Sequence, residues 1–240
     1  MSKKLKKFET RKMFYSEYLY KLVFRNELNV IFRSDFKKKE KLSFARIELD
    51  TLTEQKRSGS PMYKKQWRTI KQVSENDYYD AVELYSRLKD REDYKLRIDP
   101  NCSVTLFSND KSFLLDFANK LKTNSVEFWE PNQSHLDILK SATKVVIVDY
   151  PPKLSLRVWF NSKRINDGFA QWIEANPDKC KIGKVAFDSL QSYGYLNGLY
   201  IYLRDEKVLN LITIIAGASI RNVEKLVYKE DIDKYMYGSE

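Results

Sequence analysis

A pattern of strand, acidic turn, apolar helix and closing strand occurs twice in this chain and restricts the folds open to it. The two copies are Ser103–Trp129 and Leu199–Val227. Aligning Asp110 with Asp205 superposes an acidic helix cap, an apolar helix and a Val-Glu strand, with a slip of two residues. Leu154–Phe187 fits the same template more loosely. Short helices with one apolar stripe must cover one face of a sheet, so the pattern predicts helices layered on strands.

Further elements agree with a mixture of hairpins and helices. Asp77–Lys89 has an acidic first turn and a basic end, which is typical of a helix. We expect one hairpin in Tyr94–Phe107 and another in Tyr18–Arg33, where two β-rich runs flank Asn26-Glu27. Hairpins mixed with helices favour an α+β fold over a parallel doubly wound sheet. We therefore predict antiparallel or mixed sheets with short helices on one face, built as repeated ferredoxin-like (βαβ-type) modules, although chance similarity is the alternative to a true repeat.

Four other segments are harder to assign. Residues 1–12 fit either a basic tail or the start of a helix. Residues 42–52 fit either a strand or a short helix. Residues 54–65 contain Ser-Gly-Ser-Pro and predict a loop. Residues 228–240 predict either a short docked helix or a mobile tail.

Net positive charge is confined to the first third of the chain. Residues 1–72 hold 20 Lys and Arg against 8 Asp and Glu, while residues 73–240 hold 23 against 25. The composition shift predicts a basic, aromatic-rich N-terminal region (1–72) followed by two α+β modules, 73–150 and 151–240, the second repeating the first. A charge asymmetry of this kind indicates a polyanionic partner, most often nucleic acid.

Cations interleaved with aromatic rings are the strongest functional signal. Lys and Arg side chains neutralise phosphates, and aromatic rings stack on unpaired bases. The predicted nucleic-acid-binding residues of the N-terminal region are Tyr18, Tyr20, Lys21, Arg25, Arg33, Lys37, Lys38, Lys39, Arg46, Lys56, Arg57, Lys64, Lys65, Trp67, Arg68 and Lys71. One alternative is that the basic region binds an acidic protein partner. The other is that Tyr18, Tyr20 and Trp67 belong to the core and that the lysines confer solubility.

A smaller cluster of the same kind lies in the last third. If Leu154–Phe160 is a strand, Arg157 and Trp159 lie on one face of it while Leu156, Val158 and Phe160 lie on the other. We add Arg157 and Trp159 to the predicted binding residues. The alternative is that Trp159 covers a neighbouring helix.

The sequence supports no specific catalytic chemistry. It contains no phosphate-binding glycine motif, and its one histidine, His135, cannot be placed in a nucleophilic triad. Glu48, Asp50, Glu54 and Lys56 loosely match the acidic-plus-lysine layout of Mg²⁺-dependent nucleases, against the alternative of solvated carboxylates. We predict no catalytic residue, no metal site and no cofactor.

The resulting functional hypothesis is a non-catalytic protein that binds single-stranded or structured DNA or RNA through its N-terminal third. The first alternative is a structural or assembly subunit of a virion or nucleoprotein complex, and the second is the Mg²⁺-dependent nuclease. The Lys-, Asn-, Tyr- and Ile-rich composition is what an AT-rich genome, such as that of a phage, encodes. We expect a cytoplasmic or virion location and no membrane partner. We also expect two reduced thiols at Cys102 and Cys180, with a disulfide as the alternative.

Overall fold

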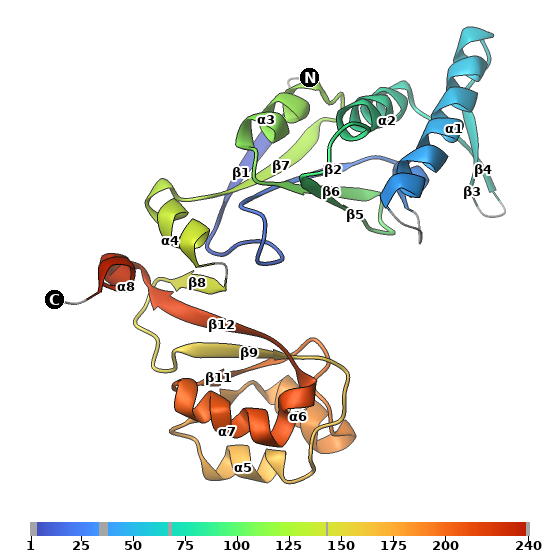
Figure 1. Cartoon of the computed structure of the whole chain (residues 1–240). Coiled ribbons are helices and arrows are strands. Elements are labelled where there is room, and N and C mark those ends of the chain that lie inside the picture. The colour runs from blue at the N-terminus through green and yellow to red at the C-terminus, as the bar shows by residue number, and fades with distance from the viewer. Residues whose placement is uncertain (1–3, 34–37, 67–68, 143, 239–240) are drawn as a thin grey trace. The chain divides into compact units, whose positions relative to one another are not determined.

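The chain forms two compact α+β units, seen in the computed structural model in Figure 1, which describes residues 4–33, 38–66, 69–142 and 144–238. The first unit contains β1 and Glu17–Pro131, and the second contains Arg11–Ser16 and the chain from Asn132 onward. The main division therefore falls after Pro131, whereas the sequence predicted boundaries at residues 72 and 150. Most of the basic N-terminal third is part of the first unit and not a region that precedes it, while Arg11–Ser16 belong to the second unit.

The first unit is built on a five-stranded sheet in the order β1-β7-β2-β6-β5, with β1 parallel to β7 and all other pairs antiparallel. A separate two-stranded ribbon, β3–β4, lies beside the long helix α1 (Figure 1). The elements of this unit are β1 (Lys4–Thr10), β2 (Tyr20–Arg25), η1 (Asn29–Phe32), α1 (Lys38–Arg57), β3 (Tyr63–Gln66), β4 (Thr69–Gln72), α2 (Glu75–Leu88), β5 (Tyr94–Ile98), β6 (Ser103–Ser108), α3 (Lys111–Lys120) and β7 (Ser125–Pro131).

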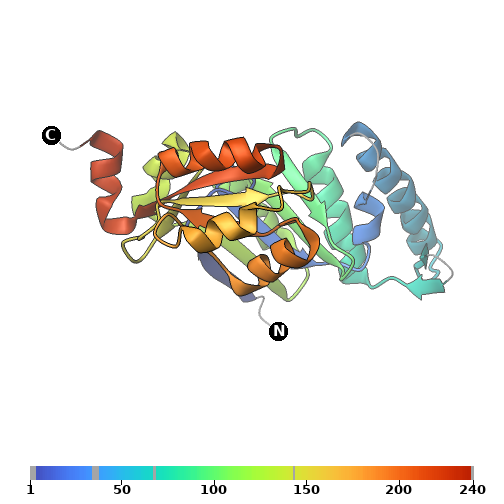
Figure 2. The same cartoon turned by 90° about the horizontal axis from the view of Figure 1, so that it is seen from below.

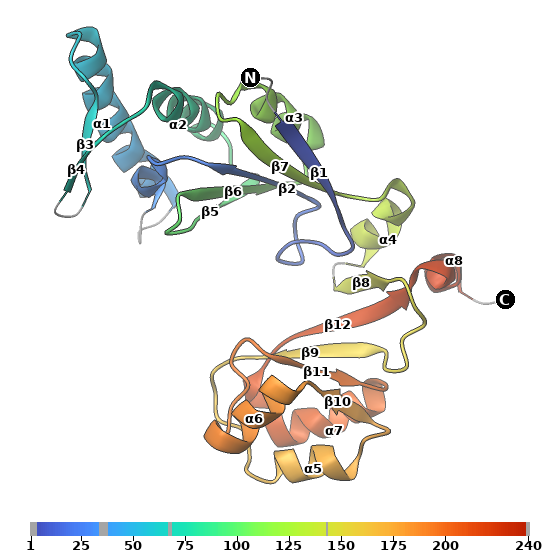
Figure 3. The ribbon, with the colours of Figure 1, turned by 180° about the vertical axis from the view of Figure 1, so that it is seen from behind.

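The second unit has a five-stranded sheet with the same succession of pairings, in the order β8-β12-β9-β11-β10 (Figure 3). Here β8 is parallel to β12 and the other pairs are antiparallel. Its elements are η2 (Gln133–His135), α4 (Leu136–Ser141), β8 (Val145–Val148), β9 (Leu156–Phe160), α5 (Phe169–Ala175), β10 (Cys180–Ile182), α6 (Lys184–Tyr193), β11 (Tyr200–Leu203), α7 (Glu206–Ala216), η3 (Gly217–Ser219), β12 (Ile220–Tyr228), η4 (Lys229–Asp231) and α8 (Ile232–Tyr237).

In each unit helices pack against one face of the sheet. In the first unit α3 packs on β2 and β6, with Phe24 edge-on to Phe117 at 5.6 Å. In the second unit α5, α6 and α7 bury the apolar side chains of β9 and β11, and Figure 2 views the unit from this helical side. Phe160 and Phe169, both fully buried, lie at the centre of that core. We call the opposite face of each sheet its open face.

Many local predictions agree with the structure. The elements β6, α3 and β7 follow the first copy of the predicted pattern, and β11, α7 and β12 follow the second. The helix α2 and the β5–β6 hairpin also lie where they were expected. The segment 228–240 contains the short helix α8.

The predicted hairpin in Tyr18–Arg33 is wrong in its second half. Only β2 forms, and the chain then turns into η1. The buried Asn26 accepts a hydrogen bond from the Leu28 amide through Oδ1 and donates to the Asp77 carbonyl, which closes a local turn in place of a two-residue hairpin. The apolar residues after the turn, including Ile31, still enter the core.

Other boundaries are corrected as well. Residues 4–10 form the edge strand β1, neither a tail nor a helix. Residues 42–52 belong to the helix α1. The predicted loop at 54–65 is shorter, because α1 continues to Arg57 and β3 starts at Tyr63. The expected strand near Phe187 is helical, since α6 follows the short strand β10.

None of the helices in the described part of the chain combines the length and the apolar composition needed to cross a bilayer.

Candidate nucleic-acid interface

Tyr18 and Tyr20 lie in the core of the first unit. Their exposed fractions are 6% and 9%, and their rings pack on Phe107 at 6.3 Å and on Phe128 at 6.2 Å. Neither ring presents a face on which a base could stack. The structure therefore places these two predicted binding residues among the packing residues, which is the alternative that the sequence left open.

Lys21 lies on the open face of the same sheet, above an aromatic pair. Its Nζ is 3.8 Å from the ring centroid of Trp129, and Phe8 stacks on Trp129 at 4.7 Å. Burial lowers the pKa of Lys21, while the nearby carboxylate of Glu127 acts in the opposite direction. Arg25 lies exposed at the end of the same strand. This face therefore presents a cation–π pair beside an exposed cation.

Several predicted cations on and around α1 are held in ion pairs. Arg46 pairs with Asp50 at 3.8 Å, and Lys64, 10% exposed, pairs with Glu48. The Nζ of Lys56 lies 2.8 Å from the Glu75 carboxylate. These pairs reduce the charge that the three cations offer to a phosphate.

Two of these pairs also remove the predicted nuclease carboxylates from a common site. Glu48 and Asp50 bind different cations, Lys64 and Arg46. Across the described residues, no three His, Cys, Asp or Glu side chains gather closely enough to hold a metal ion. The structure thus does not bring Glu48, Asp50 and Glu54 together as the nuclease hypothesis requires.

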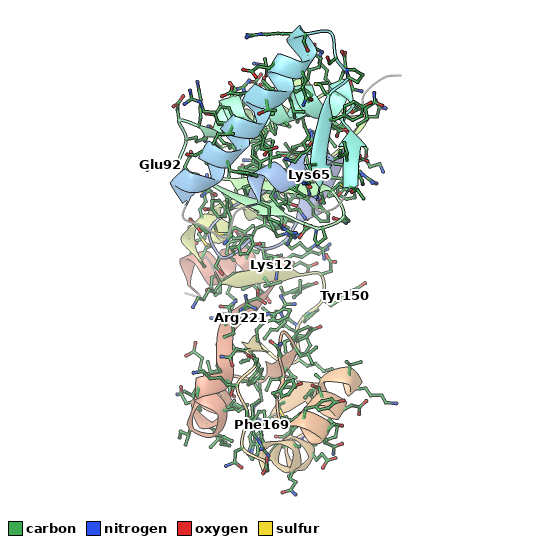
Figure 4. The ribbon with its side chains drawn as sticks, turned by 90° about the vertical axis from the view of Figure 1, so that its right-hand side faces the viewer. Lys12, Lys65, Glu92, Tyr150, Phe169 and Arg221 are labelled. Atoms are coloured by element: carbon green, nitrogen blue, oxygen red, sulfur yellow. The ribbon has the colours of Figure 1, made fainter. Side chains whose placement is uncertain are left out.

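The β3–β4 ribbon carries exposed cations and apolar side chains side by side. Residues 63–72 include three lysines and an arginine and no acidic residue. Tyr63 is 47% exposed, Ile70 is 72% exposed, and Lys65 and Lys71 are exposed as well. Lys65 is directly opposite Ile70 in the register, and Figure 4 labels Lys65 on this ribbon. Because paired residues of a ribbon share a face, Lys65 and Ile70 form one surface.

The remaining predicted residues of this region fall into two groups. Arg33, after η1, and Arg57, at the end of α1, are exposed. Lys37, Trp67 and Arg68 lie outside the described residues, and for Lys38 and Lys39 the structure describes only the backbone, at the start of α1.

Arg157 and Trp159 lie together on the open face of the second unit's sheet. Leu156, Val158 and Phe160 of the same strand are buried against the helices, so the alternation predicted for this strand is confirmed. The alternative position of Trp159, over a neighbouring helix, is not the one observed.

Arg157 and Trp159 converge on a buried carboxylate, Glu224 of β12. Glu224 is 7% exposed, and its Oε2 accepts hydrogen bonds from Arg157 Nε at 2.7 Å and from Trp159 Nε1 at 2.7 Å. Arg157 Nη2 approaches the same oxygen at 2.6 Å, and Lys12 Nζ donates to Oε1 at 3.2 Å. The four side chains form a single charged network.

The net charge of this network keeps Glu224 ionised. Burial by itself would raise the pKa of Glu224, but the hydrogen bond from Trp159 and the charges of Arg157 and Lys12 outweigh it, so the pKa is lowered. Two cations surround one carboxylate, which leaves this network net positive.

Tyr200 and Tyr202 of β11 extend the aromatic surface. Tyr200 packs on Trp159 at 4.7 Å, and Tyr202 meets Tyr200 edge-on at 5.3 Å. The Arg157 guanidinium lies 5.4 Å and 5.5 Å from the Trp159 and Tyr200 ring centroids. All three rings are half-buried, so part of each remains accessible.

The sequence prediction missed four residues of this surface: Lys12, Tyr200, Tyr202 and Glu224. The Tyr-Ile-Tyr-Leu alternation of β11 was a usable signal for the two tyrosines. Lys12 and Glu224 are separated by 212 positions, and no local pattern connects them.

Comparison with known proteins found no protein family whose model matches this chain and no curated protein with significant sequence similarity.

Proposed function

We propose that this chain is a non-catalytic nucleic-acid-binding protein and that its N-terminal third makes the main phosphate contacts. The observation that supports this most strongly is the β3–β4 ribbon, which exposes Lys65 and Lys71 on a segment without acidic residues. Exposed cations of this kind bind phosphates and release counterions. A location that holds nucleic acid, the cytoplasm or a virion, fits this function.

The shape of the ribbon supports contact with structured nucleic acid. A two-stranded β-ribbon fits the major groove of a duplex. The exposed Tyr63 and Ile70 lie on the same face of the ribbon as Lys65 and can contact sugars or base edges. Lys56 and Lys64, in contrast, are engaged with carboxylates, so we assign them to the support of the ribbon and of α1.

We further propose that the two units are repeated ferredoxin-like modules. Within the first unit, β2, α2, β5, β6, α3 and β7 give the antiparallel strand order β7-β2-β6-β5. In the second unit β12-β9-β11-β10 has the same order, and each unit adds one parallel strand at the edge. RNA-binding modules with a four-stranded sheet of this general build stack bases on its face.

Replacing Lys65 and Lys71 tests the phosphate contacts. We expect the Lys65→Gln/Lys71→Gln double variant to bind nucleic acid more weakly, because two phosphate contacts are lost. The slope of log affinity against log salt concentration should become shallower by about 1.4 for a single strand and about 1.8 for a duplex. Fluorescence anisotropy of a labelled oligonucleotide across a salt series measures both quantities.

The matched control is Lys184→Gln/Lys207→Gln, which removes two exposed lysines from the helices of the second unit. This control changes the net charge by the same amount. It should leave most of the slope of log affinity against log salt concentration unchanged. An equal change in both double variants would show that only overall charge matters. No binding by the intact protein at low salt would contradict the proposed function.

A further inference from the structure

The open face of the second unit combines rings, cations and rigidity in a way that the proposed phosphate contacts do not use. Trp159 lies on β9, and Tyr200 and Tyr202 lie on the neighbouring strand β11. In the register, Tyr200 is opposite Trp159 and Tyr202 is opposite Arg157, so the three rings and the guanidinium occupy one continuous patch. We call these four residues the aromatic patch.

Glu224 holds the side chains of the aromatic patch in fixed positions. Its carboxylate holds both the Trp159 indole N–H and the Arg157 guanidinium, so neither side chain loses much further freedom when a ligand binds. Tyr200 packs against Trp159 and also contacts Tyr202 edge-on. The patch is therefore preorganised before any ligand arrives.

The charges beside the aromatic patch have the sign that a nucleic-acid strand requires. Lys12 lies 5.7 Å from the Trp159 ring centroid, and its side chain is 41% exposed. Exposed Lys181 of β10 is paired in the register with Tyr202. Figure 4 shows Lys12 on the side of the sheet away from Phe169, which lies among the helices. Cations thus flank the rings on the open face.

We propose that the aromatic patch stacks unpaired bases of a single-stranded nucleic acid, while the exposed Lys181 contacts its phosphates and Lys12, paired with Glu224, adds positive charge beside the rings. Sequence-tolerant single-strand binding uses this combination of a basic surface and aromatic platforms, because every base has a π-face. A duplex keeps its bases stacked on one another and offers the rings nothing comparable. The proposal rests on the proposed function and adds the class of ligand, unpaired strands, and a second binding surface.

The test compares single-stranded and duplex binding by the full-length protein. The probes are a fluorescein-labelled thymidine oligonucleotide of about 15 nucleotides, within the range that such sites cover, and a duplex of the same length. We expect Tyr200→Leu and Trp159→Leu each to weaken single-strand binding by about tenfold or more, as the loss of one stacked base predicts. Duplex binding should change by less than about twofold, and the salt slope should stay the same, because stacking releases no counterions.

The matched control is Tyr193→Leu, which removes an exposed ring from α6. It should bind both probes as the parent protein does. If Trp159→Leu fails to fold, Tyr200→Leu still tests the proposal, because Tyr200 is not a hydrogen-bond partner of Glu224. Circular dichroism verifies the fold of each variant.

Failure of this inference is distinguishable from failure of the proposed function. If the parent protein binds the single strand and the Trp159 and Tyr200 variants bind it equally well, the aromatic patch is not a stacking site and the phosphate contacts of the ribbon stand. If the parent protein binds neither probe at low salt, both proposals are overturned. An equal loss for single strand and duplex would also overturn the assignment of the patch to unpaired bases.

Discussion

At the scale of single residues, Glu224 shows how one buried charge organises a surface. A carboxylate that is 7% exposed is costly unless it is paired and hydrogen-bonded. Here Arg157, Trp159 and Lys12 satisfy it. Removing one partner from such a network leaves the others buried without compensation, which costs more than the pair itself contributes. Glu224 is thus needed to hold the aromatic patch in place.

Replacing Glu224 should reveal the effect of its charge. We expect Glu224→Gln to lower the free energy of unfolding by about 2–3 kcal/mol at pH 7, because the half-buried Arg157 loses its counterion. The pKa of Glu224 in the folded protein lies below its ordinary value of 4.5. Its contribution to stability is therefore complete above that value and is lost as the pH falls through the folded-state pKa. Urea unfolding at neutral and acidic pH measures the difference.

Urea unfolding at acidic pH decides whether loss of the Glu224 charge causes the loss of stability. At a pH where Glu224 is protonated in the parent protein, the parent and Glu224→Gln should converge in stability. Glu174→Gln, which changes an exposed carboxylate of α5, should stay within about 0.5 kcal/mol of the parent at both pH values. If Glu224→Gln were less stable than the parent protein by the same amount at neutral and acidic pH, packing and not charge would account for its effect.

At the scale of elements, equivalent helices of the two units, α3 and α7, are both N-capped by an aspartate. Asp110 Oδ1 accepts a hydrogen bond from the Phe113 amide at the start of α3, and Asp205 Oδ1 accepts one from the Val208 amide at the start of α7. The Phe113 amide, followed by Ser112 and Arg91, lowers the pKa of Asp110 to about 2. The Val208 amide likewise lowers the pKa of Asp205, so both carboxylates are ionised at neutral pH and stabilise the N-terminus of their helices.

Removing either cap should destabilise its unit. We expect Asp110→Ala and Asp205→Ala each to cost about 1 kcal/mol of stability, because an amide of the first turn loses its acceptor. The contribution of the Asp110 charge is complete above its ordinary pKa of 3.8 and disappears as the pH falls to about 2. Thermal unfolding of the two variants at neutral pH and near pH 2 checks the size and the direction of both effects.

Two companion variants complete the comparison of the caps. Asp110→Asn keeps a side-chain acceptor but loses the charge, so it should lose less stability than Asp110→Ala. Asp188→Ala alters an exposed carboxylate inside α6 and should be close to neutral. If Asp188→Ala were as costly as Asp110→Ala, the capping explanation would fail.

At the scale of the whole molecule, the first 16 residues contribute to both units. β1 completes the edge of the first sheet through its parallel pairing with β7. Residues 11–16 belong to the second unit, where the Arg11 carbonyl accepts a hydrogen bond from the Ile147 amide at 2.9 Å and the Arg11 side chain pairs with Asp149. The basic N-terminus is therefore a structural part of each unit.

Deletion of residues 1–16 should increase amide hydrogen exchange in both units, at one strand of each sheet. We expect faster amide hydrogen exchange in β7, which loses β1, and at Ile147 of β8, which loses the Arg11 carbonyl. Amides of β5, at the far edge of the first sheet, should exchange at nearly the parent rate. Unchanged exchange at Ile147 would show that residues 11–16 do not support the second unit in solution.

The sequence by itself determined those features that depend on neighbouring residues. Capping aspartates and apolar periodicity located α3 and α7, and strict alternation located β9 and placed Arg157 and Trp159 on one face of it. The α+β class followed from these pieces, because short amphipathic helices and strands must share a core.

Tertiary structure alone decided the features that depend on distant partners. The pairing of β1 with β7 and the buried hydrogen bonds of Asn26 replaced the expected tail and hairpin. Long-range ion pairs decided which lysines of the basic third are engaged and which, such as Lys65, are exposed. Glu224 gathered Lys12 and Trp159 across large separations in the chain. The physical reason is that burial and charge pairing depend on proximity in space, which local residue patterns do not specify.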